Sequence, residues 1–143
     1  MKPIITTELL NKNINTVWSA ITELDHMVLW FFANIPLFKA EVGFATKFNV
    51  KSGNQNFLHV WEIVEVIPNQ KLVYKWTYPE FSDGDSFVTF KLEFKSINQT
   101  EIKVTAEGFE KYPQEIQEFK RESGVAGWNY FIKESLPNYL KTV

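Results

Sequence analysis

The sequence predicts an α+β domain in which a curved antiparallel sheet of six strands wraps around one long C-terminal helix. Three observations lead to this prediction. A helical pattern near the end of the chain follows a run of strands instead of alternating with them. The strands before it alternate apolar and polar residues and are joined by short turns, which is typical of an antiparallel meander. Thirteen Phe, five Trp and five Tyr supply large side chains for a concave surface.

The first part of the chain predicts one strand and two short helices. Residues 4–10 are rich in β-branched side chains and predict a mostly buried strand. Asn13 is a good N-cap for a helix over residues 14–22, where apolar residues recur at helical spacing. A second short helix is expected over residues 24–31, and Asn34-Ile-Pro36 ends it.

The middle of the chain changes to a period of two, which predicts five further strands. Turns with Gly, Asn, Asp or Pro separate them. Within residues 88–94, Val88, Phe90, Leu92 and Phe94 form an apolar face. The five strands are expected around residues 44–50, 57–67, 72–78, 88–94 and 102–106.

The last twenty residues predict the long helix, because apolar residues recur every three or four positions and share one face. These residues are Val125, Trp128, Ile132, Leu136 and Tyr139. Pro137 lies inside the pattern and should kink or loosen the final turn. The preceding segment, residues 111–124, predicts either a separate short helix or the lead-in to the last one.

Length and composition exclude several classes of protein. With 143 residues the chain is expected to form one domain over residues 1–143. It contains no cysteine, which excludes disulfides and thiolate metal sites. No signal peptide or membrane span is apparent in the sequence. We therefore expect a cytoplasmic protein. A net charge of −2, with Lys and Glu interspersed, argues against nucleic-acid binding.

Few residues could carry out catalysis or bind a metal. His26 and His59 are the only histidines; we expect His26 at the surface or in a cap, and His59 on a wet strand face or at a pocket edge. Glu62, Glu65 and Glu107 are expected to face solvent, although burial could turn one into a general base. The sequence has no nucleophile elbow and no glycine-rich phosphate loop. We therefore predict no catalytic residue, no metal site and no cofactor.

Several short stretches, in their order and spacing, carry a resemblance to a known family. They are residues 17–22, Met27 with Trp30-Phe31, residues 65–68 with Leu72, Tyr74 and Trp76, Gly108-Phe109, Gly127-Trp128 and Tyr139-Leu140. Over nearly its whole length the chain resembles the START-like (Bet v 1-like, SRPBCC) superfamily. Within it, the chain looks like the family of activator of heat-shock protein 90 ATPase homologues. The resemblance implies the helix-grip fold.

What the resemblance implies for function is broad. Superfamily members bind lipids, hormones, polyketides or other apolar molecules between sheet and helix, and some are enzymes. The eukaryotic namesake binds the chaperone and stimulates its ATPase, and it has an additional domain that we do not expect in this chain. The chain departs from the family pattern at Trp61, where a small residue is expected in the third strand. A side chain of this size could fill part of the cavity.

Three functions therefore stand as hypotheses. The leading one is a small-molecule binding module that holds an apolar or aromatic ligand between the sheet and the last helix. The second is a protein-interaction domain that modulates a chaperone or another partner, and the third is a cyclase- or hydrolase-type enzyme with a buried ionisable group in the cavity. The aromatic set either lines an open pocket or fills a solid core. The candidate ligand-binding residues are Trp30, Phe32, Phe48, Tyr74, Trp76, Phe90, Phe109, Trp128, Phe131 and Ile132.

Overall fold

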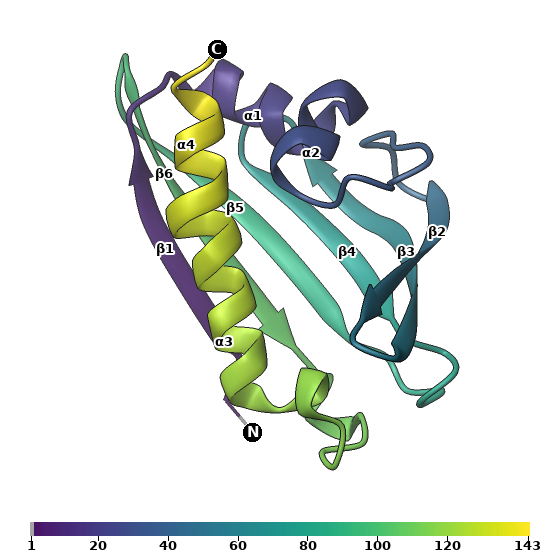
Figure 1. Cartoon of the computed structure of the whole chain (residues 1–143). Helices are drawn as coiled ribbons and strands as arrows, with labels where there is room; N and C mark the ends of the chain where they lie inside the picture. The colour runs from purple at the N-terminus through teal and green to yellow at the C-terminus, as the bar shows by residue number, and fades with distance from the viewer. Residues whose placement is uncertain (1) are drawn as a thin grey trace.

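The strands form a single sheet. They are β1 (Ile4–Leu10), β2 (Ala45–Ser52), β3 (Gln55–Ile67), β4 (Lys71–Thr77), β5 (Phe87–Ser96) and β6 (Gln99–Glu107). In the computed structural model, which describes residues 2–143, all neighbours pair antiparallel in the order β1-β6-β5-β4-β3-β2. Figure 1 shows this sheet curving around the long C-terminal helix. The predicted fold class is confirmed.

Two short helices, α1 (Ile14–Thr22) and α2 (Leu24–Trp30), cover one end of the sheet (Figure 1). The Asn13 side chain accepts a hydrogen bond from the Thr16 backbone N–H at 2.8 Å, so Asn13 is the N-cap that the sequence predicts. Inside the fold, the Trp30 indole N–H donates to the Ala20 carbonyl at 2.7 Å, which fixes α2 against α1.

The C-terminal helix consists of α3 (Arg121–Asn129), a π-helical stretch (Tyr130–Ser135) and α4 (Leu136–Leu140). Its predicted apolar face is turned inward, with Ile132 and Leu136 fully buried. The sequence predicts a kink or loosened turn at Pro137, and the helix is instead irregular in the π-helical stretch just before it, Tyr130–Ser135. Because Pro137 has no N–H to give to the carbonyl four residues before it, the regular ladder cannot continue through this point.

The segment before the C-terminal helix contains no separate α-helix. Two 3-10 turns, η1 (Phe109–Lys111) and η2 (Gln117–Phe119), carry the chain from the end of β6 to α3. Residues 111–124 are therefore the lead-in to the last helix, which is one of the two alternatives that the sequence leaves open.

The main core lies between the concave face of the sheet and the helices. A smaller cluster of Phe57, Tyr112 and Phe119 fixes the η1–η2 segment against the ends of β3 and β4. Two expectations about strands are corrected. Phe94 is 61% exposed, because it lies near the tip of the β5–β6 hairpin. Strand β1 is not mostly buried, since it is an edge strand that turns alternate residues to solvent.

Candidate ligand-binding cavity

Aromatic side chains fill the half of the helix–sheet interface nearest α2. The Phe31 ring stacks on Trp30 with centroids 4.8 Å apart and on Trp61 at 5.7 Å. It also meets Phe131 of the C-terminal helix edge to face at 4.8 Å. In this half, side chains from α2, the sheet and the last helix therefore touch one another and form a packed core.

Trp61 occupies the centre of that packed region. Its side chain is 1% exposed, and its ring centroid lies 4.8 Å from that of Phe48 and 4.9 Å from those of Tyr74 and Trp76. The Trp61 indole N–H has no hydrogen-bond partner within residues 2–143. The bulky residue that departs from the family pattern thus takes up interior volume, as its size predicts.

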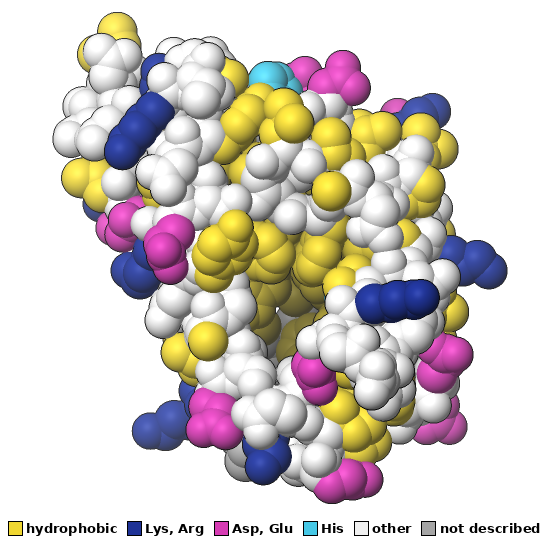
Figure 2. Space-filling model, in the orientation of Figure 1, with side chains coloured by type: hydrophobic (Ala, Val, Ile, Leu, Met, Phe, Trp, Pro, Cys, Tyr) yellow, Lys and Arg dark blue, Asp and Glu magenta, His cyan; other side chains and the backbone are white. Residues whose placement is uncertain are grey.

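The other half of the interface is open. A cavity of about 120 Å³ lies between α3 and the sheet, at the end where η1 and η2 approach β4 and β6. Figure 2 shows the corresponding hollow, with hydrophobic side chains on its walls and open to solvent on this face. The aromatic wall consists of Trp76, Tyr78, Phe109, Phe119 and Trp128. Ile4, Ala106 and Gly124 supply the remaining apolar lining.

Polar and charged residues also line the cavity. They are Lys2, Glu110, Gln114, Glu118, Lys120 and Arg121. Most of these side chains are exposed, so they mark the mouth and not the interior. The Glu118 carboxylate accepts a hydrogen bond from the Ser52 hydroxyl at 2.7 Å and so joins η2 to the end of β2.

The structure distributes the ten predicted site residues between cavity and core. Trp76, Phe109 and Trp128 line the cavity. Five others are buried in the packed core, namely Trp30, Phe48, Tyr74, Phe90 and Ile132. Phe32 and Phe131 are partly buried and pack against this core. The cavity is thus displaced toward η1 and η2 from the position that the predicted set indicates.

Sequence reasoning missed Tyr78, Ala106 and Phe119 as cavity residues. Phe119 lies in a segment whose charges predict a solvated face, yet its ring packs on Tyr112 with centroids 5.1 Å apart. A signal was present: Tyr112, Ile116 and Phe119 are apolar residues spaced by four and three positions. That spacing indicates one buried face even in a segment without a regular helix.

A directed chain of hydrogen bonds runs from the cavity wall into the sheet. The Trp76 indole N–H donates to the Tyr78 hydroxyl at 3.0 Å. His59 Nδ1–H donates to the Phe57 carbonyl at 3.0 Å, which leaves Nε2 as an acceptor for the Tyr78 hydroxyl at 3.4 Å. The direction follows because a carbonyl oxygen can only accept.

Burial explains the charge state of His59. Its side chain is 5% exposed, and desolvation lowers the pKa of the imidazole from 6.5 to about 4, so the ring is neutral near pH 7. Burial also raises the pKa of the Tyr78 hydroxyl far above its usual range, so the hydroxyl keeps its proton. Of the two alternatives for His59, the wet strand face is therefore wrong, since the ring faces inward among aromatic neighbours.

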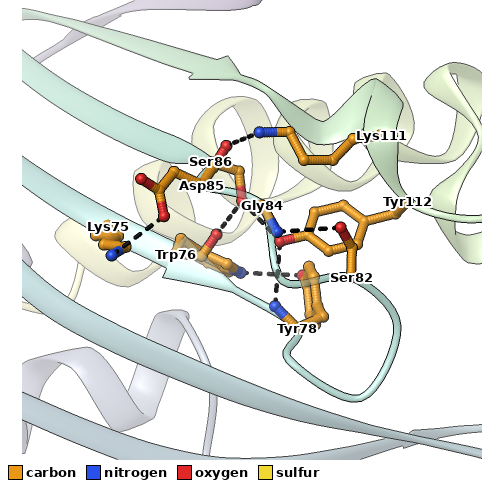
Figure 3. Close-up of polar contacts among 9 residues, drawn as sticks. All are labelled: Lys75, Trp76, Tyr78, Ser82, Gly84, Asp85, Ser86, Lys111 and Tyr112. Atoms are coloured by element: carbon orange, nitrogen blue, oxygen red, sulfur yellow. Dashed lines mark hydrogen bonds and ion pairs between the residues drawn. The ribbon is translucent and has the colours of Figure 1, made fainter.

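A second network fixes the β4–β5 loop, residues 78–86, against η1 (Figure 3). The Ser86 hydroxyl donates to the Trp76 carbonyl and accepts from the Tyr112 hydroxyl at 2.9 Å. The Tyr112 hydroxyl in turn accepts from the Tyr78 backbone N–H at 3.2 Å. These bonds order Trp76 at the end of β4 and Tyr78 at the start of the loop, both of which line the cavity.

A glycine allows the close approach of this loop to η1. Gly108 has a φ of +86°, and a Cβ at this position would lie 2.8 Å from the Asp85 carbonyl oxygen. The Lys111 ammonium donates to the same carbonyl, and the Asp85 carboxylate pairs with Lys75 at 3.1 Å (Figure 3). Only glycine fits this backbone conformation and spacing without strain.

The remaining ionisable candidates lie away from the cavity. His26 is partly buried and hydrogen bonded to the Tyr139 hydroxyl, which joins α2 to α4. Glu62 and Glu107 are exposed, and Glu65 pairs with Lys71 at 3.0 Å. Among residues 2–143, no three His, Asp or Glu side chains come together as a possible metal site. No helix in this part of the chain is long and apolar enough to cross a membrane.

Comparison with known proteins decides the family. Residues 11–141 match the model of the family described as activator of Hsp90 ATPase homolog 1-like protein. The chain belongs to this family. The match spans α1, α2, β2 to β6 and the cavity-lining part of the C-terminal helix, so it covers the candidate site apart from Lys2 and Ile4. No curated protein matches the chain.

Solved structures agree with the fold of this chain. A protein from Mesorhizobium loti matches with a TM-score of 0.76 and 23% identity, over 99% of this chain and 98% of the other. The Aha1 dimer from Colwellia psychrerythraea matches with a TM-score of 0.74 and 18% identity, over 98% and 96%. An HSP90 activator from Plasmodium falciparum matches with a TM-score of 0.69 and 16% identity, over 99% and 96%. At these identities the likeness concerns the fold.

Proposed function

We propose that this domain binds a small apolar or aromatic molecule in the cavity between α3 and the sheet. The observation that carries the proposal is the open space itself, which five aromatic side chains surround in an otherwise tightly packed interface. Protein interiors seldom leave room of this size unfilled. Concave, aromatic-lined sites with a few polar groups at the edge are the usual form of a ligand site.

The volume limits the size of the ligand. About 120 Å³ is close to the volume of an apolar cavity that accepts a single benzene ring, and it is well below the size of drug-binding pockets. We therefore propose a molecule with one ring or a short hydrocarbon chain inside the cavity. Burial of one ring, after the cost of ordering the ligand, corresponds to a dissociation constant of about 0.1–1 mM.

Binding without a chemical step fits the site better than catalysis. His59 lies behind the aromatic wall, where it is hydrogen bonded to Tyr78, and both of its ring nitrogens are engaged in hydrogen bonds. The carboxylates that line the cavity, Glu110 and Glu118, are exposed at the mouth, where water competes for them.

The absence of cysteine suits a cytoplasmic protein, which is the compartment that we propose.

Toluene is a suitable probe, and Ala106 offers a way to close the cavity. Ala106 is buried and lines the cavity, so Ala106→Leu places three extra carbon atoms in the open space. Toluene at ten times its dissociation constant should raise the melting temperature of the natural protein by about 4 °C. Ala106→Leu should remove this response. If toluene leaves the melting temperature of the natural protein unchanged, the proposal fails.

A matched control separates a filled cavity from a general effect of leucine. Ala126 is exposed on α3 and does not line the cavity, so Ala126→Leu adds the same atoms elsewhere. This variant should keep the full response to toluene. An equal loss in both variants would show that the response does not come from the cavity.

Modulation of a chaperone is the second candidate, and the family assignment favours it. The family is described by Hsp90 ATPase activation, and one structural relative is described as an HSP90 activator. The test is the ATPase rate of the host's heat-shock protein 90 with increasing amounts of this protein. A saturable rise in rate supports the interaction. An unchanged rate leaves ligand binding as the function of the domain.

A further inference from the structure

The inner wall of the cavity offers little to a polar group on a ligand. The polar tips of Trp76 and Tyr78 are already used, because Trp76 donates to Tyr78 and the Tyr78 hydroxyl is directed to His59. Phe109 and Phe119 have no polar atoms in their side chains. The deep part of the site therefore fits hydrocarbon, and a buried hydroxyl or amine there would lose its hydrogen bonds to water without replacement.

The mouth differs, because several positive charges there lack a negative partner. Arg121 uses its guanidinium to donate to the backbone carbonyls of Lys2 at 2.5 Å and Pro3 at 3.1 Å, so its charge meets no carboxylate. Lys2 and Lys120 form no ion pair within the described chain. These three cations all line the cavity.

The negative groups at the mouth only partly balance these cations. Glu110 and Glu118 are the two carboxylates that line the cavity, so the lining carries three positive and two negative charges. Glu118 is already hydrogen bonded to Ser52 at 2.7 Å. The Gln114 amide donates to the carbonyls of Tyr112 and Phe119. The charges left for a ligand are therefore predominantly positive.

The start of α3 also favours an acceptor over a donor. Lys120 precedes the first turn of α3, and its side chain makes no capping hydrogen bond. The positive charges of Lys120 and Arg121 add to the positive end of the helix dipole, and Glu122 is the acidic residue in the first turn that offsets part of them. An anion at the mouth would relieve the remaining positive charge.

We infer that the ligand of this cavity is an amphipathic carboxylate, with an unsubstituted ring or short chain inside and the carboxylate at the mouth beside Lys120, Lys2 and Arg121. This inference rests on the proposed function and specifies its ligand class. Attraction to the three cations is additional to apolar burial, and it should weaken with salt because the mouth is exposed to solvent.

Four one-ring probes separate the ligand class from binding itself. Toluene reports apolar binding alone, and phenylacetate, phenylacetamide and 2-phenylethylamine have similar shapes with a negative, neutral or positive end. At low ionic strength we expect phenylacetate to bind about fivefold more tightly than phenylacetamide, and the amine to bind more weakly than both. About 0.5 M salt should remove most of this difference.

Lys120→Glu tests the role of the mouth. A glutamate at the start of α3 suits the helix dipole, so the variant should fold. We expect about tenfold weaker binding of phenylacetate and unchanged binding of toluene. The control is Lys141→Glu, which makes the same charge change roughly 30 Å away at the far end of the C-terminal helix. It should leave both affinities unchanged.

The outcomes are distinct for the two proposals. If toluene binds but phenylacetate binds no better than phenylacetamide, or if Lys120→Glu leaves phenylacetate binding unchanged, the carboxylate inference is overturned while the binding function stands. If neither toluene nor phenylacetate binds, the proposed function itself is overturned.

Discussion

The indole rings of Trp128 and Trp76 meet edge to face across the gap between helix and sheet, with centroids 5.6 Å apart and planes at 67°. Both rings also contact Phe31, at 6.1 and 5.9 Å, in the packed half of the interface. On their other side both line the cavity. This pair of tryptophans therefore marks the boundary between the filled and the open part of the fold.

Trp128→Ala should remove one wall of the cavity together with part of the packing around Phe31. Because Trp128 is half-buried, we expect the free energy of unfolding to fall by about 2 kcal/mol, less than for a fully buried tryptophan. Toluene affinity should fall about tenfold, as measured by calorimetric titration. Tyr130→Ala removes an exposed aromatic side chain from the same helix and should change the affinity little. Equal affinities for the natural protein and Trp128→Ala would contradict the assigned wall.

Two glycine substitutions should have opposite effects. Gly108→Ala forces a Cβ against the Asp85 carbonyl at a positive φ, and it should lower the free energy of unfolding by about 2 kcal/mol. Gly127→Ala lies within α3 with open space around the new methyl group, and it should raise stability by up to about 1 kcal/mol. Urea unfolding of both variants tests the contrast. A neutral Gly108→Ala would show that the loop and η1 are not held as closely as described.

His59 should make stability depend on pH. Its pKa is about 4 in the folded protein and 6.5 when unfolded, so the unfolded chain binds more protons between these values. Stability is then fully present above about pH 6.5 and falls as the pH drops toward 4. The loss from this one group amounts to about 3 kcal/mol.

Comparison with His59→Gln isolates this contribution from the carboxylates, which also titrate in acid. The measurement is urea unfolding of both proteins at pH 7 and at pH 4.5. The natural protein should lose more stability than His59→Gln over this interval. Parallel losses in the two proteins would mean that His59 is not buried as a neutral ring.

The Tyr112 hydroxyl should contribute to stability through the bonds that it makes with Ser86 and the Tyr78 backbone. Tyr112→Phe leaves the Tyr78 N–H without its partner and should cost about 1–3 kcal/mol. The matched control is Tyr130→Phe, because the Tyr130 side chain is largely exposed on the C-terminal helix. This control should change stability by less than about 0.5 kcal/mol. If thermal and urea unfolding give equal stabilities for the two variants, the network is not formed in solution.

The fold was predictable from the sequence because its signals are local. Each of three local signals specifies one element and its buried face. They are the Asn13 cap, the spacing of Ile132 and Leu136, and the two-residue period of Val88, Phe90 and Leu92. Short turns between the strands then leave few topologies other than a meander. The family resemblance, carried by short stretches in a fixed order, agrees with this outcome.

The position of the cavity was less predictable, because it depends on contacts between distant and irregular segments. Whether an aromatic ring lines a space or fills it depends on its neighbours: Trp76 and Tyr74 share one strand face, yet only Trp76 reaches the cavity. Phe119 enters the wall from a 3-10 turn, and its spacing from Tyr112 and Ile116 indicates burial without showing which space the ring would line. The sequence left His59 open between a wet strand face and a pocket edge for a similar reason, since its burial results from the packing of Tyr78 and Trp76 against it.

An apolar ring should enter the cavity that Trp76 and Trp128 both line. A set of intermolecular nuclear Overhauser effects between toluene and the protein tests this placement. We expect contacts from toluene protons to the Ala106 methyl group and to the indole rings of Trp76 and Trp128, all of which line the cavity. We also expect these contacts to be lost in Ala106→Leu. Contacts confined to exposed side chains such as Leu29 and Val42, or no contacts at saturating toluene, would contradict this placement.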